Sequence, residues 1–554
     1  MPLDERESDG PWWHYRTMIR DARRRMLVSG FSLTAITILA IFLRLHGLEQ
    51  RGLVYWDGAK FALEGVRLHA ALDRLIGVHA PAGAGKGVGT AKPTHALLFA
   101  LAYAIVGTHD WAALTLDAVA SVVAVLLSFV IGRRLFGVVP GLIAAILLTV
   151  SPYDIIYARS ALSESDATAL LLAAVAVWSY TWIRPDGERE TRWMPRRYPL
   201  GLIVAGVLLG LAITANYRLI VYGAVLVAFD LLWAACTARR RWPLRVLLWA
   251  PSLVAVPLAW QVAGQEALRR GVVLFAYENT GRAATYAGEL QRVLAAANLT
   301  LPNPVQAEWY VQRQGIALVI LLLIGLAVAL RTHSFPWMAI AALAVVPAVI
   351  FASGPYVVAR SLASLVPFTM LLAAAGVASI AGRSSTVRAM MAILVAVGVV
   401  SSATLAWPLT QQRSGYARAA AYLSRHGQER VLTSSEVMVF YFRGNGPTCD
   451  APRLPKDLPH LAADIAAGYR YAVLDARAGG LIARIVRNQG TRVELYPVVS
   501  ATPAGLDLVG SEESSPPANP AAGEFVELYR IANLHVPTTV RVAPNTCRRN
   551  RVGS

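Results

Sequence analysis

The sequence predicts a polytopic α-helical membrane protein that ends in a small soluble α/β domain. Of its 554 residues, 56% are hydrophobic, and the mean hydropathy is +0.48. Apolar runs recur at close to the length of about 20 residues that a helix needs to cross a bilayer. After Pro408 these runs shorten and charged residues become frequent. The composition therefore excludes a wholly soluble globular protein and indicates a separate domain over residues 408–554.

The charge pattern indicates topology. Although the formal net charge is +18, the arginines lie in short clusters between apolar runs, so no continuous basic face for nucleic acid is expected. A cluster between Arg16 and Arg25 places the N-terminal tail, residues 1–25, in the cytoplasm. The next run, Met26–Leu45, has full spanning length and is expected to stay as an anchor.

Eleven spans are predicted in the membrane domain, residues 26–407. They cover 26–45, 111–132, 135–152, 166–183, 199–214, 217–234, 243–262, 314–330, 335–352, 359–381 and 387–407. Alternating these spans across the bilayer puts the later arginine clusters in the cytoplasm as well. The chain is thus predicted to be a multi-pass protein of the inner or plasma membrane, with its C-terminal domain on the extracytoplasmic side.

This topology depends on the apolar segment Pro93–Gly107. If it crossed the bilayer, every later loop would change side and the arginine clusters would face outward, against the positive-inside tendency. The segment is short for a span. We therefore predict a re-entrant or interfacial segment, with a short true span as the alternative.

The first external loop, residues 46–110, carries Asp57 just before a segment with the amphipathic pattern of a surface helix, Ala59–Leu75. An acidic residue at a helix N-terminus is often only a cap, so capping and function are both open for Asp57. Glu64 and Asp73, farther along the segment, are expected to be solvated charges.

The second external segment, Ser151–Asp166, is unusually dense in ionisable groups for a membrane boundary. Charges near hydrocarbon are costly to place, which makes such a cluster a functional candidate. The alternative is structural, because Arg159 and Glu164 lie within reach of one another if the segment is helical. For Asp154 the alternative is an ordinary turn residue.

With these residues the chain resembles the GT-C glycosyltransferases, in particular the branch of protein O-mannosyltransferases and lipid A aminoarabinose transferases. The resemblance covers about residues 30–410 and rests on the order and sidedness of several weak elements. These elements are Trp56-Asp57, Lys92-Pro93 before an apolar stretch ending at Gly107, Leu135-Phe136-Gly137 leading to Ser151-Pro152, Arg159–Glu164, and Tyr356, Arg360 and Pro367.

The resemblance implies an inverting hexosyl or pentosyl transferase. Its donor would be a polyprenyl-phosphate-linked sugar, and its acceptor a hydroxyl of a lipid, protein or polysaccharide. It implies that Asp57 takes the proton of the attacking hydroxyl, assisted by Glu164 or Asp154. The groups expected to meet the charge of the departing phosphate are Lys92, Arg159, Arg360 and His95.

The chain also departs from the family pattern. Many relatives carry a second acidic residue directly after the loop aspartate, where this chain has Gly58, and Pro-Pro where it has Pro93-Thr94. A metal held by an acidic pair in this loop is therefore not implied. A divalent metal stays open as a cofactor, but no metal ligand is assigned from sequence. For Arg360, snorkelling of the side chain to the interface is the alternative to phosphate contact.

The third external loop, residues 263–313, interleaves aromatic and polar residues such as Tyr277 and Trp309, which suits either sugar contact or the membrane interface. The C-terminal domain is expected to be α/β. Its predicted strands are Arg430–Ser435, Arg470–Asp475, Arg492–Val498 and Glu524–Ile531, and its predicted helices Tyr416–Arg425, Pro459–Ala467 and Leu481–Arg487. Cys449 and Cys547 share this domain and are predicted to form a disulfide.

Two other classes of function compete with a transferase. A transporter or flippase of lipid-linked substrates would also be basic and polytopic, but such proteins usually show repeated halves or broken helices with midplane charges. The sequence shows no repeat, and Asp117 is the only carboxylate that lies deep within a predicted span. A membrane scaffold would explain the C-terminal domain but not the charged clusters of the first two external loops.

Overall fold

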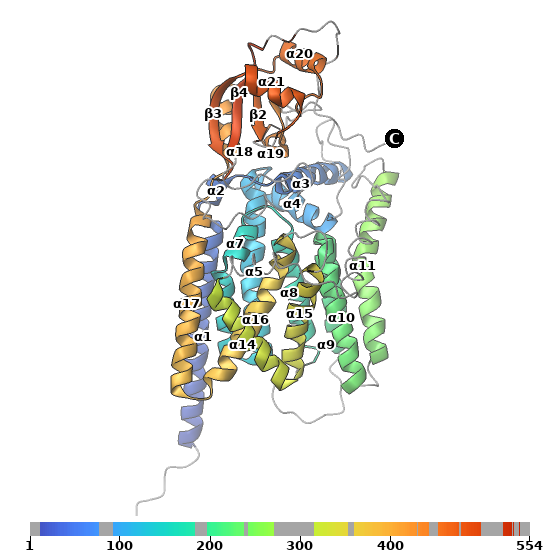
Figure 1. Cartoon of the computed structure of the whole chain (residues 1–554). Helices are drawn as coiled ribbons and strands as arrows, with labels where there is room; N and C mark the ends of the chain where they lie inside the picture. Colours follow the sequence, from blue (N-terminus) through green and yellow to red (C-terminus); the bar gives the residue numbers. More distant parts are fainter. Residues whose placement is uncertain are drawn as a thin grey trace, which may run out of the picture.

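The computed structural model shows a long helical bundle with a small α/β domain at one end (Figure 1). It describes residues 12–76, 92–182, 197–237, 242–270, 315–352, 359–428, 430–442, 453–475, 478–499 and 525–534, together with 536 and 542. Residues 271–313 of the third external loop, with Tyr277 and Trp309, and both Cys449 and Cys547 lie outside these residues, so the predictions about them are untested; residues 263–269 of that loop belong to a helix.

Apolar helices form the bundle. They are α1 Trp12–Leu45, α5 Asp110–Phe136, α6 Val138–Thr149, α8 Glu164–Ser179, α9 Arg197–Ala215, α10 Ile220–Thr237, α11 Trp242–Arg269, α14 Ile316–Thr332, α15 Phe335–Ala352, α16 Val366–Ala381 and α17 Ser385–Thr410. Within the described residues, 6 helices are long and apolar enough to cross a membrane, and α6 with the short α7, Pro152–Ala158, forms a pair bent by 61°. The total of eleven spans stays a prediction.

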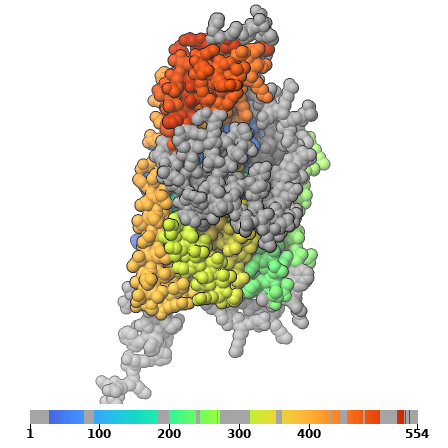
Figure 2. Space-filling model, viewed as in Figure 1, coloured from blue at the N-terminus to red at the C-terminus, as the bar shows by residue number. Residues whose placement is uncertain are grey.

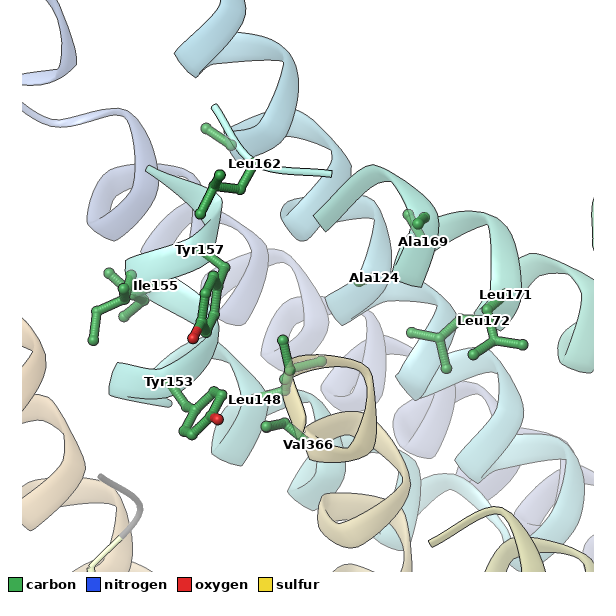
Figure 3. Close-up of a cluster of buried hydrophobic side chains, with 14 of the residues drawn as sticks. Ala124, Leu148, Tyr153, Ile155, Tyr157, Leu162, Ala169, Leu171, Leu172 and Val366 are labelled. Carbon is green, nitrogen blue, oxygen red and sulfur yellow. The ribbon is translucent and has the colours of Figure 1, made fainter. Parts of the chain in front are cut away.

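Small residues let the helices approach closely, as expected where the surrounding lipid supplies no hydrophobic driving force for association. Where α14 crosses α16, a Cβ added to Gly376 would lie 2.5 Å from the Cα of Gly325. Any side chain at this crossing would separate the two backbones. Another part of the core, around the start of α16, is filled by larger side chains from α6, α7, α8 and α16 (Figure 3).

Short elements gather at the bundle end that carries the α/β domain (Figure 1). They are α2 Leu48–Arg51, α3 Trp56–Leu75, α4 Pro93–Val106, α7, and the 3₁₀ helices η1 Tyr217–Leu219 and η2 Ala359–Leu365. The predicted surface helix thus begins at Trp56 instead of Ala59, and the predicted span 359–381 begins as a 3₁₀ segment. Helix α3 packs on α4. Glu64 is only 3% exposed, so its expected solvation is wrong.

The α/β domain contains a four-stranded sheet of order β1-β2-β4-β3. Strand β1 (Val431–Thr433) pairs in parallel with β2 (Tyr471–Asp475), whereas β4 (Phe525–Arg530) is antiparallel to both β2 and β3 (Thr491–Pro497). Four helices accompany the sheet: α18 Gly415–Arg425, α19 Glu436–Tyr441, α20 Leu458–Ala466 and α21 Leu481–Gln489. The space-filling view shows this domain, in orange and red, at one end of the molecule, with the orange helix α17 running up to it along one edge (Figure 2).

Polar contacts fix the domain to the bundle. The Tyr441 hydroxyl at the end of α19 donates to Asp110 Oδ2 at 2.7 Å and accepts from the backbone N–H of Leu53 at 2.9 Å. Since Asp110 begins α5 and Leu53 leads into α3, one tyrosine ties the domain to both helices. The domain therefore lies over the short elements that surround the candidate site.

Candidate functional site

An ion pair joins two distant segments at this end of the bundle. Asp57 lies in the first turn of α3, and its Oδ2 accepts a hydrogen bond from Arg360 NH1 in η2. The two side chains are 16% and 12% exposed. Tyr55, not Asp57, occupies the N-cap of α3. Asp57 and Arg360 thus bind each other. Asp57 does not occupy the cap position, and Arg360 does not extend to the membrane interface.

Opposing effects act on the pKa of Asp57. Burial raises it, but the charge and hydrogen bond of Arg360, and then the ammonium groups of Lys92 and Lys60, lower it by more. The net pKa lies below the ordinary value of an aspartate. Asp57 is therefore ionised at neutral pH, and its basicity depends on whether Arg360 remains beside it.

The backbone of α3 approaches the second external segment at Gly58. A Cβ added to Gly58 would lie 2.6 Å from the carbonyl oxygen of Ser160. Ala161, the next residue of that turn, has a positive φ of 55°. A second acidic side chain after Asp57 would therefore clash with this turn, which explains the departure from the family pattern at Gly58.

Lys92 precedes α4 and is 5% exposed. Its Nζ donates to Ser163 Oγ at 2.6 Å and lies 4.4 Å from the centre of the Phe61 ring. Burial lowers the pKa of Lys92, while the nearby carboxylate of Glu164 raises it and the charge of Arg360 lowers it further. Lys92 is thus a desolvated cation within electrostatic reach of both Arg360 and Glu164.

Glu164 begins α8, and its side chain is 1% exposed. Its Oε1 accepts from Asn216 Nδ2 at 3.4 Å and lies 3.6 Å from Arg218 NH1. The alternative of an ion pair between Arg159 and Glu164 is therefore wrong, because Glu164 pairs with Arg218. The sequence analysis missed Asn216 and Arg218, although the break between the apolar runs 199–214 and 217–234 falls on the external side of the predicted topology.

Arg159 is fully buried and binds backbone instead of lining this site. Its NH1 donates to the carbonyl oxygens of Arg44 and His46 at 2.7 and 2.9 Å, and its NH2 to that of Thr410 at 3.0 Å. These carbonyls lie at the ends of α1 and α17. The guanidinium therefore satisfies helix-end acceptors, and we no longer count it among the phosphate contacts.

Asp154 is engaged in a neighbouring cluster. Arg44 NH2 donates to its Oδ2 at 2.5 Å, and the Ser121 hydroxyl donates to the same oxygen. The side chain of Arg44 is fully buried and that of Asp154 is 10% exposed. This buried pair joins α1, α5 and α7. The structure thus gives Asp154 a structural partner and does not bring it into contact with Asp57.

His95, on the first turn of α4, pairs with a buried acid. Its Nδ1 lies 3.0 Å from Asp166 Oδ2 on α8, and Asp117 of α5 belongs to the same buried group. The His95 ring also meets Phe61 edge-on at 5.3 Å, on the same ring that Lys92 contacts. Of the predicted site residues, the structure therefore brings together Asp57, Arg360, Lys92 and Glu164. His95 lies next to this group but pairs with Asp166, whereas Arg159 and Asp154 have other partners.

Another buried acid, Asp230, lies nearer the other end of α10 and was not predicted from the sequence. Asp230 accepts hydrogen bonds from Arg245 Nε at 2.6 Å and from three indole N–H groups, those of Trp178, Trp182 and Trp249, at 2.6, 2.5 and 2.9 Å. The carboxylate is well satisfied, as a buried charge must be. This cluster is structural and binds α8, α10 and α11 together.

Comparisons with known proteins give one family match and several matches in overall fold. Residues 90–260 match the family model of dolichyl-phosphate-mannose-protein mannosyltransferases. The solved structure of ArnT from Cupriavidus metallidurans in the apo state is similar over 94% of this chain and 100% of that chain, with 14% identity and a TM-score of 0.54. ArnT bound to undecaprenyl phosphate is similar over 91% of this chain and 98% of that chain, with 14% identity and a TM-score of 0.53.

A third solved structure is matched over a smaller share of its own chain. The oligosaccharyltransferase AglB from Archaeoglobus fulgidus, in complex with an inhibitory peptide and a dolichol-phosphate, matches 82% of this chain and 70% of that chain, with 12% identity and a TM-score of 0.54. No curated protein sequence matches the chain significantly. At these identities the solved structures share the fold, and the family model adds a sequence match across α4 to α11.

Proposed function

We propose that the chain is a membrane glycosyltransferase of the GT-C type, because its fold is similar to those of ArnT and AglB and residues 90–260 match a mannosyltransferase family model. It would transfer a hexosyl or pentosyl group from a polyprenyl-phosphate-linked donor to an acceptor hydroxyl. The reaction would take place on the extracytoplasmic side, at the bundle end that carries the α/β domain. The observation that carries this proposal is the Asp57–Arg360 pair, with the desolvated cation Lys92 beside it.

The proposed chemistry is a single displacement. The acceptor oxygen attacks the anomeric carbon, the bond from that carbon to the phosphate oxygen breaks, and its electron pair leaves with the phosphate. Asp57 takes the hydroxyl proton, a general-base contribution of about 10²–10⁴ in rate. Attack opposite the leaving phosphate inverts the anomeric configuration.

Arg360 connects donor binding to this base. A guanidinium binds phosphate oxygens in the same forked geometry in which it binds a carboxylate. A donor phosphate at η2 would therefore compete with Asp57 for Arg360. Because Arg360 is the main cause of the lowered pKa of Asp57, donor binding would raise that pKa and make Asp57 a better base when a sugar is in place.

Lys92 supplies a second positive charge for the leaving phosphate. Its burial strengthens electrostatic attraction, since few water molecules compete. Glu164 assists by stabilising the ammonium form of Lys92, and it is itself held by Asn216 and Arg218. The proposed division of roles is therefore Asp57 as base, Arg360 and Lys92 as phosphate contacts, and Glu164 as the residue that maintains the charge of Lys92.

The lipid donor is supported by the fold relatives. One solved ArnT structure holds undecaprenyl phosphate, and the AglB structure holds a dolichol-phosphate. Apolar helices surround the site, so a polyprenyl tail would remain in the bilayer while its phosphate reaches Arg360. The acceptor is proposed here only as a hydroxyl of a lipid, protein or polysaccharide.

Reconstitution tests this function against a flippase. The purified protein in liposomes is supplied with polyprenyl-phosphate sugars and a cell-envelope extract as acceptor, and the lipid is followed by mass spectrometry. A transferase releases free polyprenyl phosphate and adds the mass of one sugar to an acceptor. Donor that changes leaflet with its sugar still attached, and no sugar-bearing product, would overturn the proposal in favour of transport.

A further inference from the structure

Three ionisable side chains meet inside the helical bundle below the candidate site. His95 comes from α4, Asp117 from α5 and Asp166 from α8. One ligand atom of each lies within 4.8 Å of the others, and all three residues are buried. Their relative exposures are 0%, 0% and 3%. The cluster therefore joins three helices in the buried interior of the bundle.

The cluster lacks the partners that buried charges need. His95 Nε2, both carboxylate oxygens of Asp117 and Asp166 Oδ1 have no hydrogen bond of normal geometry. Within the described part of the chain, no lysine or arginine forms an ion pair with either aspartate, and the neighbouring cation Lys92 is bonded to Ser163. Buried polar atoms are rarely left unsatisfied, and an unpaired buried carboxylate is costlier still. Among the described residues, Asp117 interacts favourably only with the backbone N–H of Leu162 and, at longer range, with the charge of Lys92, so a bound cation would complete this group.

The donor set indicates what that charge is. One imidazole nitrogen and two carboxylate oxygens suit Zn²⁺ and Mn²⁺, which accept both kinds of ligand. Two ligand atoms on one such ion lie at most about 4.4 Å apart, because each metal–ligand bond is about 2.0–2.2 Å long. The spacing within 4.8 Å needs only a small side-chain adjustment to meet this limit.

We propose that His95, Asp117 and Asp166 bind one divalent transition-metal cation, of the class of Zn²⁺ and Mn²⁺. The site is separate from the Asp57–Arg360 pair. It is structural, because the ion would cross-link the start of α4, which follows Lys92, to the first turn of α8, which contains Glu164. It would thereby fix the distance between these two residues.

Metal content tests the proposal without any assay of transfer. The purified protein is stripped with a chelator, supplied with Mn²⁺ or Zn²⁺, desalted and analysed by mass spectrometry of the metal. We expect about one ion per chain. The same addition should raise Tm by at least about 2 °C, since a ligand that binds only the folded state stabilises it. If no metal is bound and Tm is unchanged, the proposal is wrong, and the three side chains share a proton instead of a metal ion.

Variants locate the ion. Asp117→Asn and His95→Leu should each lose the bound metal and the metal-dependent rise in Tm. Asp110→Asn is the matched control, because it makes the same change on the same helix at a carboxylate that already bonds to Tyr441. It should keep the full metal content. If one of the two cluster variants fails to fold, the other still tests the proposal. A folded cluster variant that retains its metal would show that His95, Asp117 and Asp166 do not bind the ion.

Discussion

Asp57 and Arg360 form an ion pair across 303 residues of sequence, between the first turn of α3 and the 3₁₀ helix η2. Neither side chain is fully buried, at 16% and 12% exposed. The structural pair of Asp230 and Arg245 is more enclosed, at 0% and 1%, and in the structural pair with Arg44 only Asp154 is partly exposed, at 10%. The partial exposure of the first pair is consistent with a site in which a ligand replaces one of the partners.

Arg360→Ala should weaken donor binding as well as turnover, because a phosphate contact is made in the ground state and the transition state alike. Loss of a hydrogen bond to a charged group costs about 1.5–3 kcal/mol, so the KM for donor should rise by about 10- to 100-fold. Steady-state kinetics with varied donor give the value. Arg418→Ala is the control, since Arg418 lies on Tyr496 in the α/β domain. An unchanged donor KM in Arg360→Ala would exclude the proposed contact.

The lowered pKa of Lys92 predicts a pH effect. Only the ammonium form attracts phosphate, so kcat/KM should fall with rising pH at a value below the about 10.4 of an ordinary lysine. Bound donor phosphate raises the pKa again, and the fall in kcat should therefore come at higher pH than the fall in kcat/KM. Lys92→Arg should shift the fall in kcat/KM upward, since a guanidinium stays charged. If kcat/KM of Lys92→Arg fell at the same alkaline pH as that of the unmodified protein, a group other than Lys92 would be responsible for the fall.

Asp230→Asn should destabilise the bundle strongly. Breaking one partner of a buried ion pair leaves the other charge uncompensated and costs about 3–5 kcal/mol. Thermal unfolding of the purified protein in detergent should show a clearly lower Tm. Glu266→Gln removes an exposed carboxylate that pairs with Arg269 and Arg270, and should leave Tm nearly unchanged. Equal values of Tm for the two variants would contradict the structural role of Asp230.

The predicted topology places the α/β domain and α3 outside the cytoplasm. In a variant without native cysteines, Ile76→Cys and Arg484→Cys should react in intact cells with a thiol reagent that cannot cross membranes. Arg383→Cys, in the turn between α16 and α17, should react only after lysis. Reaction at Ile76 and Arg383 from the same side would overturn the topology.

Much of the helical bundle was predictable because apolar length and arginine position are local properties of a sequence. Helices occur at each predicted span, and strands occur at the four places expected in the α/β domain. The 3₁₀ segment that contains Arg360 was not predictable, since Arg360 there binds Asp57, which is 303 residues away in the sequence. The order of motifs in the family pointed to Asp57 and Arg360 separately, but only the folded structure shows that they are in contact.

Buried polar pairing was the least predictable feature. Arg159 and Glu164 are close in sequence, yet one binds carbonyls at the ends of α1 and α17 and the other pairs with Arg218. Spacing along one segment says which side chains are neighbours only if that segment stays helical. Here the turn around Ala161 separates α7 from α8, and the two side chains leave in different directions.

Single-turnover transfer by Asp57→Asn tests the central claim most directly. The variant keeps a side chain of similar size that still accepts a hydrogen bond from Arg360, but it cannot take the acceptor's proton. With donor bound, the rate of transfer should fall by about 10²–10⁴. Donor affinity should stay the same or rise, because a neutral asparagine competes less with the donor phosphate for Arg360. Asp73→Asn, on the same helix, should transfer at the normal rate. Transfer by folded, donor-loaded Asp57→Asn within about threefold of the unmodified protein, far from the loss expected of a missing base, would contradict this account.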